Sequence, residues 1–182
     1  MNAAVPAVLP SRLALRHGRS AVVREIQPDD REAFNAAFLR LSADARYTRF
    51  LNPIRQLSDA TLDLATNPAP EREFALVALD GDGPDAAIVA GARYVASMDQ
   101  SDTCEFAVTI ADDWQGLGLA GHLLPILMAT ARERGLRCME GFVLPANTAM
   151  RRLAVRLGFT DAAVPGDWSL RRVSIELDKW AP

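Results

Sequence analysis

Three glycines fall within six residues of one segment, Gln115-Gly116-Leu117-Gly118-Leu119-Ala120-Gly121. Before it, residues 103–110 alternate apolar and polar side chains as a strand does, and residues 119–134 after it carry an apolar stripe at helical spacing. The glycines therefore occupy a strand-to-helix turn. Backbone N–H groups and the helix dipole attract anions at such a turn, and glycine lets a phosphate approach the backbone. A tight turn that binds nothing is the alternative, although turning alone needs fewer glycines.

The same letters also match G-x-G-x-x-G, the fingerprint of a dinucleotide-binding fold, with Glu140 about 20 residues further on. Two features oppose this hypothesis. Residues 111–115 separate the strand from the first glycine, and Glu140 opens the following strand instead of closing it. The upstream chain also predicts helices followed by a meander, where a dinucleotide fold has alternating strands and helices.

Local patterns predict the elements on both sides of the turn. Pro28, Asp29 and Asp30 favour a helix start, and Phe34, Ala37, Phe38 and Leu41 form one apolar stripe. Pro125 lies past the first turn of the helix that follows the glycines, so we expect a kink or a short irregular first turn there. The further elements expected are helices after Ser42, at 58–66 and at 147–157, a hairpin of strands 74–80 and 88–96, and strands at 103–110, 138–144 and 162–177.

Composition limits the function classes. The chain has 182 residues, 49% of them hydrophobic, which suits one globular domain over 21–182 after a flexible arm at 1–20. A net charge of −3 gives no general attraction to nucleic acid or to an anionic membrane, and no apolar run is long enough to span a bilayer. Two cysteines and two histidines cannot supply a metal site. We expect a cytoplasmic protein without metal, a monomer or homodimer.

Gln115, Gly118 and Ala120, with Gly116 between them, resemble the pyrophosphate-binding signature Q/R-x-x-G-x-G/A of the GNAT superfamily of N-acetyltransferases. A second stretch about 30 residues later, from Asn147 to Leu157-Gly158-Phe159, is similar to the cofactor-contacting helix of that family. The six-residue motif alone is a weak indication of this family, and the two motifs at this spacing are a strong one. The resemblance implies an α/β (α+β) fold with a mixed, mostly antiparallel central sheet flanked by helices.

The resemblance also implies acetyl-CoA as the acyl donor and a set of residues that contact it. That set is Val108, Ile110, Gln115, Gly116, Leu117, Gly118, Leu119, Ala120, Gly121 and Asn147. Glu105, which points away from the apolar row of its strand, matches the position of the catalytic glutamate of the family and is our candidate general base. A strand residue that is solvated, or one that is paired with Arg93, is the alternative. Many family members place a tyrosine acid where this chain has Ala154.

Residues 41–50, 71–79 and 105–108 resemble the acetyltransferase domain of bacterial Pat-type protein lysine acetyltransferases. This favours a protein lysine as the acceptor amine. A small amine or amino-acid derivative remains open, and so does a module that binds acyl-CoA without catalysis. Arg46, Tyr47 and Arg49 are expected to border the acceptor site. Cys104 and Cys138 are interpreted as reduced core residues, because no motif places a histidine beside either of them.

Overall fold

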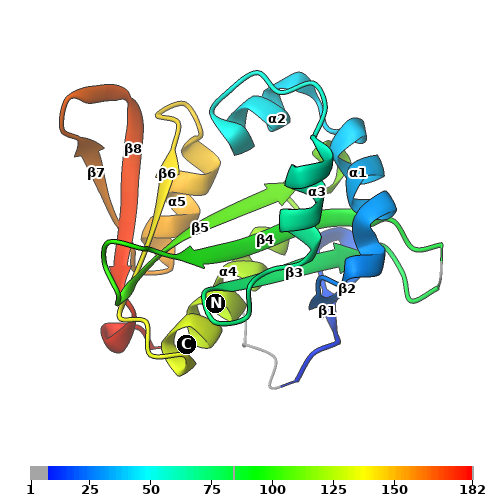
Figure 1. Cartoon of the computed structure of the whole chain (residues 1–182), viewed down its shortest axis with the longest axis horizontal. Coiled ribbons are helices and arrows are strands. Elements are labelled where there is room, and N and C mark those ends of the chain that lie inside the picture. Colours follow the sequence, from blue (N-terminus) through cyan, green and yellow to red (C-terminus); the bar gives the residue numbers. More distant parts are fainter. Residues whose placement is uncertain (1–7, 84, 182) are drawn as a thin grey trace.

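One eight-stranded sheet forms the centre of the computed structural model, which describes residues 8–83 and 85–181 (Figure 1). The strand order is β1-β2-β3-β4-β5-β6-β8-β7, and every neighbouring pair is antiparallel except β5 and β6. This confirms the predicted mixed, mostly antiparallel sheet and rules out the alternating parallel fold of dinucleotide-binding proteins. The strands are β1 Ser11–Ala14, β2 Ser20–Glu25, β3 Glu73–Leu79, β4 Ile88–Ala96, β5 Thr103–Ile110, β6 Cys138–Val143, β7 Thr160–Val164 and β8 Asp167–Glu176.

Within the described part of the chain, five α-helices cover the two faces of this sheet (Figure 1). Three helices between β2 and β3 lie on one face, and the long helix after β5 crosses the other face together with the helix after β6. The helices are α1 Arg31–Arg40, α2 Ala43–Phe50, α3 Asp59–Thr66, α4 Leu119–Glu133 and α5 Thr148–Arg156.

Side-chain caps fix where three of these helices begin. The Ser42 hydroxyl accepts a hydrogen bond from the Ala45 amide, and the Ser58 hydroxyl accepts one from the Thr61 amide, each at 3.1 Å. The Asn147 side chain does the same for the amide of Met150 at 3.1 Å. These bonds satisfy amide groups that a helix start leaves without partners. They confirm the helix starts predicted at Ser42, Ser58 and Asn147.

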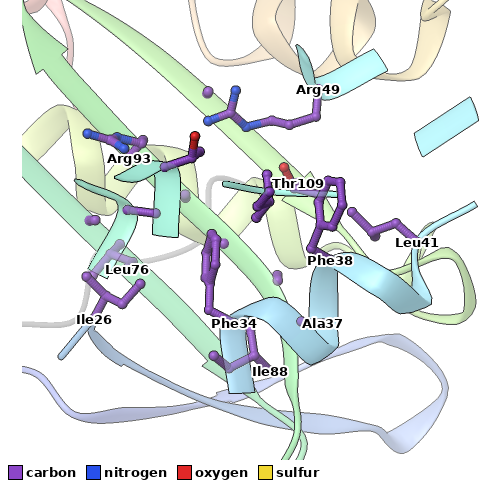
Figure 2. A pocket seen from close by; sticks show the side chains of 18 of the residues that line it. Ile26, Phe34, Ala37, Phe38, Leu41, Arg49, Leu76, Ile88, Arg93 and Thr109 are labelled. Carbon is purple, nitrogen blue, oxygen red and sulfur yellow. The ribbon is translucent and has the colours of Figure 1, made fainter. Parts of the chain in front are cut away.

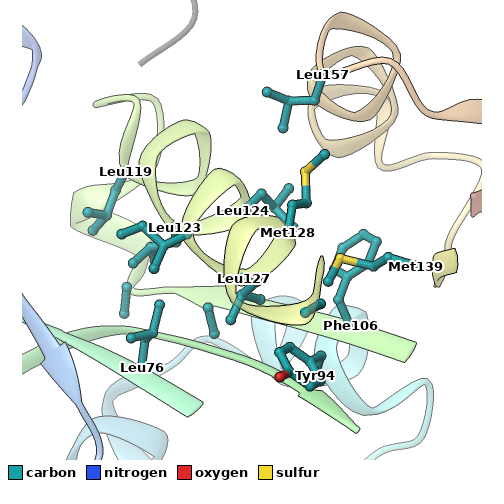
Figure 3. Close-up of a cluster of buried hydrophobic side chains, with 14 of the residues drawn as sticks. Leu76, Tyr94, Phe106, Leu119, Leu123, Leu124, Leu127, Met128, Met139 and Leu157 are labelled. Atoms are coloured by element: carbon teal, nitrogen blue, oxygen red, sulfur yellow. The ribbon is translucent and has the colours of Figure 1, made fainter. Parts of the chain in front are cut away.

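The main core lies between α4 and the sheet (Figure 3). The fully buried α4 side chains Leu123, Leu124, Leu127 and Met128 pack in one cluster with buried residues of β3 to β6. α4 runs as one helix from Leu119 through the buried Pro125, so an irregular first turn is not found, and the kink stays a prediction. Packing on the sheet holds the helix although the ring removes one backbone hydrogen bond.

The start of the chain corrects one expectation. Residues 11–14 of the predicted flexible arm form β1, the edge strand, which pairs with β2 from Ser11↔Val23 to Ala14↔Ser20. Leu13 and Leu15 are buried in the main core. Residues 1–7 of the predicted arm lie outside the described residues. Because Leu13 and Leu15 anchor it, the segment from residue 11 onward is part of the folded domain.

Within the described residues no helix is long and apolar enough to cross a membrane. The same part of the chain contains no group of three or more His, Cys, Asp or Glu side chains able to hold a metal ion.

Candidate active site

The glycine-rich turn joins the end of β5 to α4 through a short 3-10 helix at Asp112–Trp114. Gly116 and Gly118 have φ values of +75° and +95°, a left-handed conformation that side chains rarely adopt. Leu117 and Leu119 are buried, so alternate residues of the turn anchor it in the core while the glycines face outward. Ala120 and Gly121 lie in the first turn of α4, at the positive end of the helix dipole, which attracts an anion. The Gly121 amide itself donates to the Gly118 carbonyl at 2.9 Å.

Two further contacts hold the turn in place. The Gln115 side-chain amide donates to the Ile110 carbonyl at 3.3 Å and ties the turn back to β5. At the other side, a Cβ added to Gly121 would lie 3.7 Å from Cδ1 of Leu153, so α4 and α5 meet closely there. The turn is therefore fixed between β5 and α5 before any ligand arrives.

A cation from the start of the chain lies against this turn, and no local sequence pattern predicts it. The Arg16 amide donates to the Leu117 carbonyl at 3.1 Å, and its guanidinium donates to the Gly116 carbonyl at 3.3 Å. The Arg19 guanidinium stacks 3.7 Å from the centroid of the Trp114 ring. The loop between β1 and β2 thus brings positive charge to a site already suited to phosphate. Residues about 100 positions apart give no local signal of such contact.

The neighbouring strands β5 and β6 stay together for only three residues. Their parallel pairing covers Thr103↔Cys138, Cys104↔Met139 and Glu105↔Glu140 and then ends, although β5 continues to Ile110 (Figure 1). The edge of β5 at Val108 and Ile110 therefore has no partner from β6. An extended chain with amide groups can pair with such an edge.

The residues predicted to contact the acyl donor thus come from three neighbouring parts of the fold. Val108 and Ile110 lie on the open part of β5, the glycine-rich turn follows directly, and Asn147 caps α5, whose Leu153 meets the start of α4. Donor binding by these residues stays a prediction. The residues fit a donor with a pyrophosphate and an amide-containing arm, because they offer helix N–H groups, a guanidinium and an open strand edge.

Glu105 is the last residue of β5 that pairs with β6. Cys104 and Phe106 are buried in the α4-side core, and Ala107 and Thr109 line a cavity on the opposite face, to which Glu105 belongs by alternation. Arg93 forms an ion pair with Glu73 at 2.7 Å and lies opposite Ala107, so the alternative pairing of Glu105 with Arg93 is wrong. Glu105 remains available at the surface.

The environment of Glu105 suits a base. Burial raises its pKa above the ordinary glutamate value, the nearby charge of Glu140 raises it further, and the charge of Arg49 lowers it. A carboxylate with a raised pKa accepts a proton more readily. The pKa of Cys104 is raised to about 12 by burial, and burial also raises that of Cys138. Both cysteines therefore remain thiols near neutral pH, which opposes a covalent mechanism through either.

Glu140→Gln is expected to move the acidic limb of the kcat/KM profile to lower pH. Glu105 must be a carboxylate to act as a base, so activity falls as the pH drops through its raised pKa. Removing the like charge of Glu140 favours the carboxylate and lowers that pKa. Arg49→Gln removes an attractive charge and is expected to move the limb upward. Profiles of wild type, both variants and the exposed control Glu133→Gln test this, and shifts of the opposite sign contradict it.

The face of the sheet that carries Glu105 also contains a cavity of about 290 Å³, which the sequence did not predict (Figure 2). It lies between α1 to α3 and the strands β3 to β5. Arg49, from the region expected to border the acceptor site, lines it together with Arg93. Its walls are assembled from elements far apart in sequence.

A family model described as an acetyltransferase (GNAT) domain matches residues 21–160. The chain belongs to this family. Acetyltransferase PA5475 of Pseudomonas aeruginosa strain PAO1 is 38% identical over 154 residues, which are 85% of this chain and 82% of that protein. This chain is therefore a GNAT acetyltransferase that uses acetyl-CoA as acyl donor.

Two further relatives carry the name Pat. Acetyltransferase Pat of Mycolicibacterium smegmatis is 29% identical over 152 residues, 83% of this chain but only 44% of that protein. The GNAT domain of S. lividans PAT superimposes with a TM-score of 0.83 at 28% identity, covering 95% of this chain and 99% of that domain. The structure of yncA of Salmonella typhimurium, a putative acetyltransferase with its cofactor acetyl-CoA, has the same fold, with a TM-score of 0.71 at 24% identity over 89% of this chain and 96% of that one.

Proposed function

We propose that this GNAT acetyltransferase transfers acetyl directly from acetyl-CoA to a primary amine, with Glu105 as general base. The observation that carries the proposal is the position of Glu105. It lies at the residue where β5 and β6 separate, between the open strand edge suited to the donor and the cavity lined by Ala107 and Thr109. A base at this junction can meet both substrates.

The proposed reaction needs a neutral amine. An amine with a pKa of about 10.4 is almost entirely protonated near pH 7, so a base that removes the proton assists attack. The acyl donor supplies an acetyl thioester. Glu105 takes one proton from the ammonium group directly or through a water. The neutral amine nitrogen then bonds to the acetyl carbon, the carbon–sulfur bond breaks, and the second proton on nitrogen passes to water. Ala154 offers no acid, so the thiolate either leaves unprotonated or takes a proton from water.

Two acceptor classes follow from different observations. Similarity to the GNAT domains of Pat proteins supports a protein lysine. The cavity beside Glu105, at about 290 Å³, supports a small amine, because small-molecule sites are typically concave and apolar with a few polar groups.

Labelled acetyl-CoA offered to a cell lysate and to a panel of amines tests the proposal. Label on an amine confirms acetyl transfer, and its distribution between proteins and small molecules identifies the acceptor class. Tight CoA binding without transfer to any amine supports a binding module instead. Binding of NADH in place of CoA contradicts the donor assignment.

Arg16→Ala is expected to raise the KM for acetyl-CoA by about tenfold, because it removes a charge-assisted contact to the donor phosphates. The same variant should use acetyl-pantetheine, which lacks those phosphates, as well as wild type does. Steady-state kinetics with both donors measures the effect. Arg12→Ala, in the same hairpin but paired with Asp82, is the control. Equal losses with both donors contradict a phosphate contact.

A further inference from the structure

The walls of the cavity beside Glu105 are mostly apolar (Figure 2). α1 contributes aromatic rings, Leu57 and α3 add aliphatic side chains, and the sheet forms the floor. These side chains include Phe34, Phe38, Leu41, Leu57, Leu64 and Ile88. A volume of about 290 Å³ lies at the lower limit of ordinary ligand pockets. The space therefore suits a small apolar group.

Two guanidinium groups, those of Arg49 and Arg93, line the same cavity (Figure 2). The Arg93 head group pairs with Glu73 through one nitrogen, whereas its buried Nε has no hydrogen-bond partner within the described residues. Arg49 lies over the Phe50 ring, 4.9 Å from its centroid, and across residues 8–83 and 85–181 it makes no ion pair. A guanidinium offers five donors, so both groups retain unused hydrogen-bonding capacity.

The charge of Arg49 is poorly compensated. Its pKa is lowered to about 10, chiefly by burial and then by the charge of Arg93, and only the charge of Glu105 acts in the opposite direction. Removing a charge from water is unfavourable unless a partner of opposite charge replaces the water. Glu73, which also lines the cavity, already compensates the charge of Arg93, so the uncompensated charge is that of Arg49. An anion that pairs with Arg49 and accepts a hydrogen bond from the Nε of Arg93 would therefore stabilise this site. Carboxylates fit this geometry, since guanidinium binds them through paired hydrogen bonds.

The base lies next to this site. Glu105 precedes Ala107 by two residues on the same face of β5, a step of about 7 Å along a strand. Glu105 and Arg49 also affect the pKa of each other. An amine near Glu105 and an anion near Arg49 would thus be only a few bonds apart in one molecule. The apolar wall lies beyond them.

We propose that the acceptor of this enzyme is a small apolar amino acid or amino-acid derivative whose carboxylate binds Arg49 and Arg93. Its amine faces Glu105 and its side chain enters the apolar cavity. This inference rests on the proposed acetyl transfer and names its substrate class. A protein lysine places a flexible hydrocarbon chain in such a site and brings no anion to the two guanidinium groups.

Calorimetric titration of L-leucine and L-phenylalanine, each against its own amide, into the protein saturated with CoA tests the carboxylate contact. The acids are expected to bind about tenfold or more tightly than the amides, the usual scale for a hydrogen bond to a charged group. Glycine, which lacks the apolar group, is expected to bind more weakly than leucine. Arg49→Gln should remove the preference for the acid, and the exposed control Arg55→Gln should keep it.

Acetylation of the same pairs provides the second readout. The amides have the less basic amine, so chemistry alone favours them, and faster acetylation of the acids supports the inference. Equal binding of acid and amide by wild type overturns it whether or not the variants fold. Acetylation confined to lysine in peptides also overturns it and leaves acetyl transfer intact. Acid-selective binding that depends on Arg49, without any acetylation, keeps the binding site and rejects the proposed function.

Discussion

Glu105→Gln is expected to lower kcat by about 10²–10⁴-fold, the usual scale for removing a general base, while CoA affinity stays close to wild type. The amide cannot accept the amine proton near neutral pH. The side chain lies at the end of the β5–β6 pairing and not in the glycine-rich turn, so the predicted phosphate site is untouched. Steady-state kinetics over a range of pH and calorimetric titration of CoA measure the two quantities.

Glu133→Gln, an exposed substitution near the end of α4, removes the same charge far from this junction and is expected to leave both quantities unchanged. Turnover of Glu105→Gln near the wild-type value at every pH rejects the base assignment. A parallel loss of CoA affinity indicates a structural role for the carboxylate and also contradicts it.

Gly118→Glu is expected to abolish measurable CoA binding. Gly118 is the N-cap residue of α4 and has φ of +95°, so any side chain strains the turn, and a carboxylate there repels the donor phosphates. The nearest atom to an added Cβ is Nε of Arg16 at 4.0 Å, so the new carboxylate also competes for the cation beside the site. Calorimetric titration of CoA measures the loss.

The matched control is Gly135→Glu. Gly135 has φ of +84° and open space around an added Cβ, at the other end of α4. The Gly135→Glu variant has the same backbone strain and the same added charge, but far from the glycine-rich turn. Its affinity for CoA is therefore expected to match that of wild type. Equal CoA affinity for Gly118→Glu and wild type removes the turn from the donor site.

Local chemistry explains which parts of the fold were predictable. Ser42, Ser58 and Asn147 are caps within three residues of the amides they bind, and the alternation over Thr103–Ile110 needs no distant partner. β1 was missed because a four-residue edge strand depends on pairing with β2. α4 continues through Pro125 for a similar reason, since packing on the sheet outweighs a local preference.

The site divides in the same way. The glycines of the turn and the alternation that separates Glu105 from the apolar row of its strand can be recognised from the sequence alone. The contact of Arg16 with Leu117 and the cavity that gathers Arg49 and Arg93 join residues far apart in sequence. Only the folded backbone brings such residues together, so no local sequence pattern predicts this contact or this cavity.

The short contact between β5 and β6 has a mechanical consequence. β1 to β5 form one half of the sheet and β6 to β8 the other, and three residue pairs are the whole of the strand pairing between the halves. In the proposed complex, acetyl-CoA contacts both sides of the boundary between β5 and β6 and so stabilises the two halves together. A ligand at 100 times its dissociation constant adds about 2.7 kcal/mol to the free energy of unfolding. The resistance of this enzyme to heat and proteolysis is then expected to rise with the concentration of acetyl-CoA.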